Sequence, residues 1–226
     1  MTIGFEVYPS AEQISSDILE QFKSIGVSHV SDVMQRIPGS DGDLKKYDSG
    51  KVLVGTAVTV KTRPGDNLMI HKAIDRARPG DVIVVDGGGD MSRALFGEIM
   101  KLMCVNKGIA GIVLNGCLRD VDDFINDDFP VYAKGVTHKG PYKTGPGVVN
   151  QTIAFDDLII HPGDLVFGDS DGVISLRPDE IPQVLKDAKE KFNTEQKKLE
   201  ALRNGTETKQ FVTDEELIEM GCTIHG

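Results

Sequence analysis

The chain has 226 residues, and its 35 acidic and 25 basic side chains give it a formal net charge of −10. This acidic excess argues against nucleic acid and against an anionic membrane surface as the main partner, because both are bound through a surplus of Lys and Arg. The length suits one large domain or two small ones, and it suffices to bury a core without disulfide bonds.

The sequence also indicates where the protein works. Its apolar runs are far shorter than a membrane span, and its first residues lack the basic start and apolar core of a signal peptide. Cys104, Cys117 and Cys222 are widely spaced and form no metal-binding or disulfide pattern. We therefore expect a cytoplasmic protein in a reducing compartment, with no membrane partner.

The first elements are predicted from capping and periodicity. Ser10 and Gln13 form the pattern of a capping box, and the apolar residues that follow at helical spacing predict a first helix. A second helix is predicted over residues 28–36. A strand rich in Val and Thr follows over 51–62, and then a helix over 66–77.

The middle of the chain alternates between strand and helix patterns. We predict strands over residues 81–85, 109–114 and 129–133, and helices over 91–106 and 121–126. Successive β-α-β units require crossover connections, so this order predicts a partly parallel sheet covered by helices.

The last third of the chain begins with a long, basic, glycine-rich loop over residues 135–149, and loops of this length are often functional. Short strands are predicted over 152–176, followed by a highly charged helix over 179–203. Nothing in the composition marks a linker. We therefore expect a single domain over residues 1–226, in which residues 179–226 form a C-terminal helical arm that also carries a short helix near its end.

Several common active-site patterns are missing. The segment Asp86-Gly87-Gly88-Gly89-Asp90 has neither G-x-G-x-x-G spacing nor a following Lys-Ser/Thr, which disfavours a dinucleotide enzyme, a methyltransferase and a P-loop protein. The five histidines do not cluster at metal-binding spacing. No G-x-S-x-G nucleophile motif occurs either.

Two acidic constellations remain, both after the carboxyl ends of buried strands, where open α/β sheets place their ligands. One is Glu98, and the other is the run that starts with Arg119 and Asp120. An Arg fork and a Mg²⁺ held by Asp can together stabilise a developing enolate. The structural alternative is that Asp120, Asp122 and Asp123 only complement the dipole at a helix N-terminus.

An ordered set of motifs then resembles a known family. Gly97 is followed, after twenty-one residues, by Arg119-Asp120 and then Asp123. Further matches are Gly80-Asp81-Val82, Gly108-Ile109-Ala110-Gly111, Phe129-Pro130-Val131, Gly145-Pro146-Gly147 and Pro162-Gly163-Asp164-Leu165. Together they resemble the class II pyruvate aldolases that cleave 4-hydroxy-4-methyl-2-oxoglutarate and 4-carboxy-4-hydroxy-2-oxoadipate, a family shared with the regulator of ribonuclease E activity A.

The resemblance implies an architecture. The family fold is an α-β-β-α sandwich of the swivelling phosphohistidine-domain type, assembled as a homotrimer or homohexamer with sites between subunits. Its aldolases also take an acid from a neighbouring subunit's C-terminal helix, for which Glu190 and Glu195 are the candidates here.

The resemblance also implies roles for individual residues. Asp120 would ligate Mg²⁺ or Mn²⁺ directly, while Glu98 and Asp123 would act on the metal through water. Arg119 would contact the keto oxygen of the pyruvyl group and stabilise its enolate. These expectations make Arg119, Glu98 and Asp120 the candidate catalytic residues.

The substrate-binding candidates surround this group. The substrate carboxylate would bind the backbone N–H groups of Ile99 and Met100, at a helix that restarts after Gly97. Asn115 and Gly116 would shape the pocket. Local positive charge for an anionic 2-oxo acid would come from Arg119 and the metal, with Lys139 and Lys143 as further candidates.

The implied reaction is metal-dependent retro-aldol cleavage of a 4-hydroxy-2-oxo acid to pyruvate and a second oxo acid. Oxaloacetate decarboxylation passes through the same enolate, so it is expected as a side activity. The alternative is a non-enzymatic regulator that binds a ribonuclease E-type protein, as one branch of the family does. That branch can lack the metal-binding Asp, which this chain retains at Asp120.

Overall fold

The computed structural model describes residues 3–50, 52–206 and 212–225. The chain divides into two compact units, residues 1–189 and residues 190–226. The strands are β1 (Phe5–Val7), β2 (Lys45–Lys46), β3 (Leu53–Thr62), β4 (Asp81–Phe96), β5 (Gly111–Leu118), β6 (Val131–Val136), β7 (Gly147–Val149), β8 (Ile153–Phe155), β9 (Leu158–Ile160), β10 (Leu165–Asp169) and β11 (Gly172–Leu176). The helices are α1 (Ser16–Phe22), α2 (Val27–Val33), α3 (Leu68–Arg76), α4 (Glu98–Asn106), α5 (Asp122–Ile125), α6 (Ile181–Arg203) and α7 (Asp214–Glu219).

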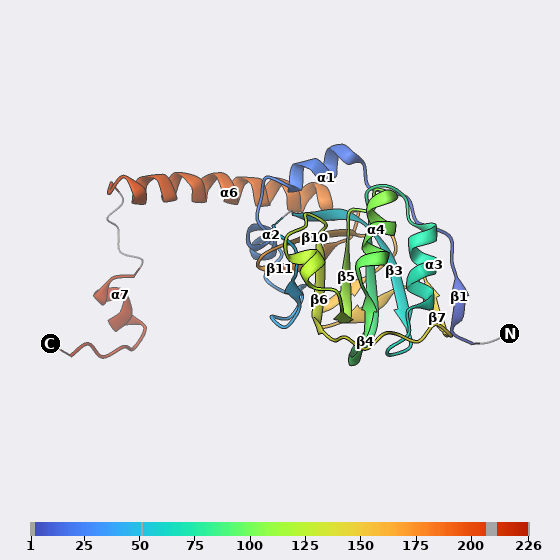
Figure 1. Ribbon diagram of the computed structural model, residues 1–226. Coiled ribbons are helices and arrows are strands. Elements are labelled where there is room, and N and C mark those ends of the chain that lie inside the picture. Colours follow the sequence, from blue (N-terminus) through green and yellow to red (C-terminus); the bar gives the residue numbers. More distant parts are fainter. Residues whose placement is uncertain (1–2, 51, 207–211, 226) are drawn as a thin grey trace. The chain divides into compact units, whose positions relative to one another are not determined.

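The first unit is built on a mixed sheet with the order β1-β7-β3-β4-β5-β6-β2 (Figure 1). β3, β4, β5 and β6 run parallel to one another, as the alternating pattern of the sequence predicts. β10 and β11 form an antiparallel hairpin that joins the sheet through β3. The predicted mixed α/β fold with a C-terminal helix is confirmed.

Alternate residues of β3, β4 and β5 enter two separate cores, because successive side chains of a strand point to opposite faces. The helix-side core packs these strands against α3 and α4, and its strand residues include Val58, Val60, Ile83, Val85, Ile112 and Leu114. The strand-side core packs the other face against the β8–β9 hairpin and β10, and it includes Ala57, Val82, Val84, Val113 and Phe155. Burial on both faces explains why these strands read as continuous apolar runs.

The predicted capping box at Ser10 and Gln13 is wrong, because α1 begins only at Ser16. The Gln13 side chain instead donates hydrogen bonds to the carbonyl of Pro79 (3.0 Å) and to the Asp81 carboxylate (2.8 Å). Gln13 therefore ties the N-terminal segment to the start of β4.

The predicted helix over residues 91–106 is wrong in its first turns. β4 runs on to Phe96, and α4 begins at Glu98. Beyond Asp86, the pairing of β4 with β5 continues through irregular steps, so the glycine-rich segment belongs to a bulged strand. β5 likewise continues to Leu118, past the predicted end at residue 114.

The second unit contains the later part of α6 and all of α7. Thr213 caps α7: its hydroxyl accepts from the Glu216 N–H (3.2 Å), and the Glu216 carboxylate accepts from the Thr213 N–H (2.8 Å). Glu190 and Glu195 are exposed on α6. None of the helices in the described ranges combines the length and apolar character needed to cross a bilayer.

Candidate active site

Two neighbouring strand ends bring the main candidates together. The last residues of β4 and β5, Phe96 and Leu118, are paired in register. The Arg119 N–H donates to the Phe96 carbonyl (3.0 Å), which keeps the chain after β5 beside the chain after β4. Asp120 then takes a left-handed backbone conformation (φ 59°), which Asp tolerates better than most residues. Arg119 and Asp120 therefore lie beside the start of α4.

Gly97 makes this close approach possible. A Cβ atom at Gly97 would lie 2.5 Å from Asp120 Oδ2 and 3.1 Å from Arg119 Cγ, closer than van der Waals contact allows. Asp120 Oδ2 accepts from the Glu98 N–H (3.2 Å) and forms an ion pair with Arg119 Nε (3.5 Å). The Gly-to-Arg-Asp spacing thus has a steric basis, because the glycine leaves room for the Asp120 carboxylate.

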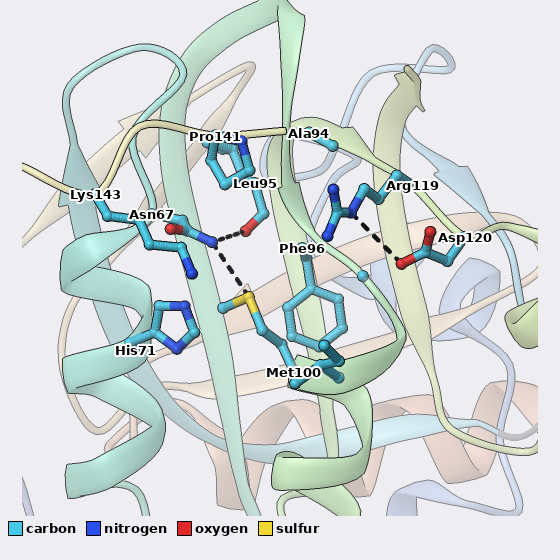
Figure 2. Close-up of a pocket in the computed structure, with 12 residues that line it drawn as sticks. Asn67, His71, Ala94, Leu95, Phe96, Met100, Arg119, Asp120, Pro141 and Lys143 are labelled. Carbon is cyan, nitrogen blue, oxygen red and sulfur yellow. Dashed lines mark hydrogen bonds and ion pairs between the residues drawn. The ribbon is translucent and has the colours of Figure 1, made fainter. Parts of the chain in front are cut away.

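A cavity of about 80 Å³ lies against this pair. Its lining residues are Asn67, His71, Ala94, Leu95, Phe96, Gly97, Ile99, Met100, Arg119, Asp120, Pro141 and Lys143 (Figure 2). In Figure 2, Arg119 and Asp120 stand on one side of the cavity, and Asn67, His71 and Lys143 stand on the other. The volume is well below the ~300–1,000 Å³ of sites for drug-sized ligands, so this cavity suits a small group such as a pyruvyl unit.

Asn67, at the N-terminus of α3, carries an unsatisfied polar atom. Its side-chain N–H₂ donates to the Leu95 carbonyl (3.1 Å) and contacts Met100 Sδ (3.3 Å). Its Oδ1 is buried and has no hydrogen-bond partner among the described residues. A buried acceptor without a partner costs stability, which points to a donor supplied by a ligand or by water.

Asp66 holds the loop that carries Lys143 in place through hydrogen bonds. Its carboxylate accepts from the backbone N–H groups of Leu68 (2.9 Å), Thr144 (2.8 Å) and Gly145 (2.9 Å). Burial raises the pKa of Asp66, but these hydrogen bonds favour the charged form and bring the pKa below its ordinary value. Asp66 is therefore ionised at neutral pH and joins the start of α3 to the loop over residues 141–145.

His71 is the histidine of this cavity. Burial, followed by the positive charge of Lys143, lowers the pKa of His71 below its ordinary value. Because an unperturbed histidine titrates near pH ~6.5, the His71 imidazole is neutral at pH 7. A neutral imidazole can accept or donate a proton.

Asp120 is the residue that fits a divalent cation. Its side chain is 39% exposed at the cavity wall, and a carboxylate is a hard oxygen ligand. In the part of the chain that the structure describes, no three His, Cys, Asp or Glu side chains lie close enough to hold a metal alone. Mg²⁺ commonly binds one or two carboxylates, with water and substrate completing its coordination. The donor set therefore fits Mg²⁺ or Mn²⁺ rather than a closed zinc site.

The N–H groups of the predicted anion site lie in the first turn of α4. Ile99 and Met100 line the cavity, and N–H groups in the first turn of a helix have no acceptor within the helix. The Glu98 N–H is already bonded to Asp120, and the Glu98 side chain is exposed. Asp123 is also exposed, and its N–H donates to the Asp120 carbonyl (3.1 Å).

Other candidates lie away from the cavity. Asn115 lines a different pocket, where its side-chain N–H₂ donates to Asp86 (3.0 Å). Gly116 packs against Leu95. Lys139 is exposed, and its carbonyl accepts from the Ala94 N–H (2.8 Å).

Sequence reasoning missed Asn67 and His71. They are four residues apart, at and just after the start of α3, so they share one helix face. That spacing was the available signal, but only the fold shows that this face lies opposite Arg119.

Comparison with known proteins now identifies the family. The family model for RraA-like proteins (Aldolase/RraA) matches residues 27–175, a range that contains every residue lining the cavity. The chain belongs to the Aldolase/RraA family. The resemblance read from the sequence is therefore confirmed.

Individual relatives agree with this assignment. A protein of Halalkalibacterium halodurans, provisionally named a 4-hydroxy-4-methyl-2-oxoglutarate aldolase, is 37% identical over 179 residues, which are 79% of this chain and 85% of the relative. The crystal structure of an uncharacterized protein from Pseudomonas syringae pv. tomato has a TM-score of 0.78 and 26% identity, covering 87% of this chain and 97% of that one. The RNA-processing inhibitor RraA from Thermus thermophilis has a TM-score of 0.61 and 26% identity, covering 66% of this chain and 90% of its own.

Proposed function

We propose that this protein is a divalent-metal-dependent lyase of the cytoplasm. It would cleave a 4-hydroxy-2-oxo di- or tricarboxylic acid, of the 4-hydroxy-4-methyl-2-oxoglutarate type, to pyruvate and a second oxo acid. The observation that carries the proposal is the cavity in which Arg119, Asp120 and the first turn of α4 surround a space of pyruvyl size. The provisional names of relatives support the same activity.

Each group at the cavity has a role in this proposal. The substrate carboxylate binds the N–H groups of Ile99 and Met100, and Arg119 donates to the keto oxygen at C2. Asp120 would hold Mg²⁺ or Mn²⁺, and the bound cation would supply Lewis-acid stabilisation of the charge that develops on that oxygen. A water molecule at the site would take the proton of the C4 hydroxyl, and the O–H electron pair would form the C=O bond of the second oxo acid. The C3–C4 bond would break, and its electron pair would form the enolate that Arg119 stabilises. Return of a proton from water to C3 would then give pyruvate.

Oxaloacetate is the expected second substrate. Loss of carbon dioxide from oxaloacetate leaves the same pyruvate enolate, so Arg119 and Asp120 would serve both reactions. This activity needs no proton acceptor for a C4 hydroxyl. It therefore separates enolate stabilisation from the step that opens the aldol.

The test is pyruvate release from 4-hydroxy-2-oxo acids and from oxaloacetate, with Mg²⁺ or Mn²⁺ and with EDTA. We expect metal-dependent release, lost by at least about 1,000-fold in Asp120→Asn, because the enolate then lacks its cation. Asp122→Asn is the matched control, since Asp122 is an exposed acid two residues on, and it should keep wild-type activity. Absence of pyruvate from every substrate, or full activity of Asp120→Asn, would overturn the proposal.

A regulator of RNA processing is the alternative, favoured by the likeness to the RraA structure. Its readout is capture of a ribonuclease E-type protein by the purified chain. Capture that survives Asp120→Asn, together with no pyruvate release, would assign the chain to this function.

We also propose a homotrimer or homohexamer in which Glu190 or Glu195 of one subunit serves a neighbouring site. The outer face of α4 supports assembly, because Ile99, Leu102 and Val105 are 70%, 49% and 49% exposed. Such an apolar face is unusual on a monomer. Light scattering gives the mass, and a monomeric mass would contradict this assembly.

A further inference from the structure

A second, apolar groove lies next to the candidate active site. It is lined by Phe5 and Val7 of β1 and by Leu68, Met69 and His71 of α3, with Glu6, Lys72 and Asp75 completing the lining. Its volume is about 530 Å³, and its lining is mainly apolar. A concave apolar surface of this size is typical of a small-molecule site.

One residue of the described chain, His71, is common to the linings of the groove and the cavity. His71 lines both spaces, so its imidazole forms the boundary between them. The loop that carries Lys143 of the cavity also passes close to the groove, because the Phe5 ring (3.4 Å) and Leu68 (3.6 Å) lie next to the Cβ position of Gly145. The groove therefore adjoins the cavity at His71, which stands across the cavity from Arg119 (Figure 2).

The orientation of the substrate follows from the proposed function, on which this inference rests. In Figure 2, His71 and Lys143 stand across the cavity from Arg119 and Asp120. With the pyruvyl group against Arg119 and Asp120, C4 and its substituent would therefore point toward His71 and Lys143. The cavity of about 80 Å³ has little room beyond the pyruvyl group. Any longer substituent must leave it, and the apolar groove adjoins it at His71.

We propose that the groove is a subsite for an apolar chain on C4 of the substrate. The substrate class would then be 4-hydroxy-2-oxo di- or tricarboxylic acids in which C4 also carries an alkyl or aryl group of several carbons, in place of the methyl group. The groove would bind the chain between Phe5 and Val7 on one side and Leu68 on the other. The Lys72–Asp75 ion pair (3.0 Å) at the edge of the groove would stay in water.

The test uses 2-oxo acids that lack the 4-hydroxyl and so cannot be cleaved. Pyruvate, 2-oxobutanoate, 2-oxohexanoate and 2-oxooctanoate are titrated calorimetrically in the presence of Mg²⁺. We expect the dissociation constant to fall about fourfold for each methylene group beyond C4, the value for burial of a methylene group from water. A dissociation constant that does not depend on chain length would overturn the proposal.

Variants of groove residues test whether the dependence of affinity on chain length arises in the groove. Phe5→Ser and Val7→Ser should each reduce the ratio of affinities between 2-oxooctanoate and pyruvate by about tenfold. Both residues are partly exposed (45% and 36%), so both variants should fold, and each checks the other. Ile159→Ser is the control, because Ile159 is a 63% exposed apolar residue on β9 that does not line the groove, and it should keep the wild-type ratio. Unchanged ratios in both groove variants would contradict the subsite.

Cleavage assays test the groove and the proposed lyase activity separately. Pyruvate released from short 4-hydroxy-2-oxo acids, together with affinities that ignore chain length, would overturn the groove alone. Affinities that rise with chain length, together with no pyruvate from any substrate, would overturn the lyase and keep the groove as a binding site. Both results together support the full proposal.

Discussion

Two clusters of charged and polar residues lie at neighbouring strand ends. They differ in whether their buried polar atoms all have hydrogen-bond partners. In the first, around Asp120, the side chains of Arg119 and Asp120 are 42% and 39% exposed. In the second, the lysine cluster, Lys61 pairs with Asp86, and Lys134 pairs with Asp43 and Asp156. Both combine basic side chains with aspartates.

The difference lies in what remains to be bound. In the lysine cluster, the buried Asp86 carboxylate accepts from Lys61, from Asn115 (3.0 Å) and from the Gly88 N–H (2.9 Å). At the cavity, the buried Asn67 Oδ1 has no partner in the described ranges. Composition does not distinguish these two clusters, whereas the unpaired Asn67 Oδ1 at the cavity does.

Breaking the lysine cluster should therefore cost stability and leave catalysis intact. Lys134 is 9% exposed, and Lys134→Met would leave the Asp43 and Asp156 carboxylates without their cation. We expect the free energy of unfolding to fall by about 3 kcal/mol in urea titrations, as for other broken buried pairs. Lys198→Met, at an exposed position of α6, is the control and should change it little. Equal stabilities of the two variants would contradict the comparison.

The stabilisation by Lys134 should also depend on pH. Burial lowers the pKa of Lys134, but its hydrogen bonds to Asp156 and Asp43 outweigh burial and raise it above its ordinary value. A group whose pKa is raised on folding stabilises the protein below its unfolded pKa, and this contribution is lost as pH rises through the folded value. The difference between wild type and Lys134→Met should therefore shrink above pH ~10.4.

The matching change at the cavity should cost catalysis and little stability. In Gly97→Ala, the new Cβ displaces the Asp120 carboxylate, because the two atoms would be only 2.5 Å apart. We expect kcat/KM to fall about 100-fold, the size of effect that a misplaced catalytic group produces. Gly42→Ala is the control, since a Cβ at Gly42 meets nothing within 4 Å. Wild-type kcat/KM in Gly97→Ala would exclude this steric requirement.

Sequence reasoning reached the fold because the apolar runs of β3, β4 and β5 mark a sheet buried on both faces. It found Arg119 and Asp120 because they follow β5 directly. It misplaced the start of α4, since the residues after Asp86 read as a loop and a helix, whereas pairing with β5 holds them as a bulged strand. Tertiary pairing overrides local propensity in such segments.

The predicted position of Asn115 shows a second limit. Side chains alternate along β5, so Ile112 and Leu114 enter the helix-side core while Val113 enters the strand-side core. By the same alternation, Asn115 points to the strand side and joins the lysine cluster. His71 was missed because Arg119, which lies across the cavity from it, is 48 positions away in the sequence.

The smallest expected effect concerns the pKa of His71 at the cavity, which the nearby positive charge of Lys143 helps to lower. Lys143→Met removes the positive charge that lowers the pKa of His71, although burial, the larger cause, remains. We expect the His71 pKa to rise toward its ordinary value, and NMR titration of the His71 Hε1 resonance measures it. Lys139→Met removes the same charge from an exposed position of the same loop and should leave that pKa unchanged. An equal rise in both variants would mean that general positive charge, rather than Lys143 at the cavity wall, adds to the effect of burial on the His71 pKa.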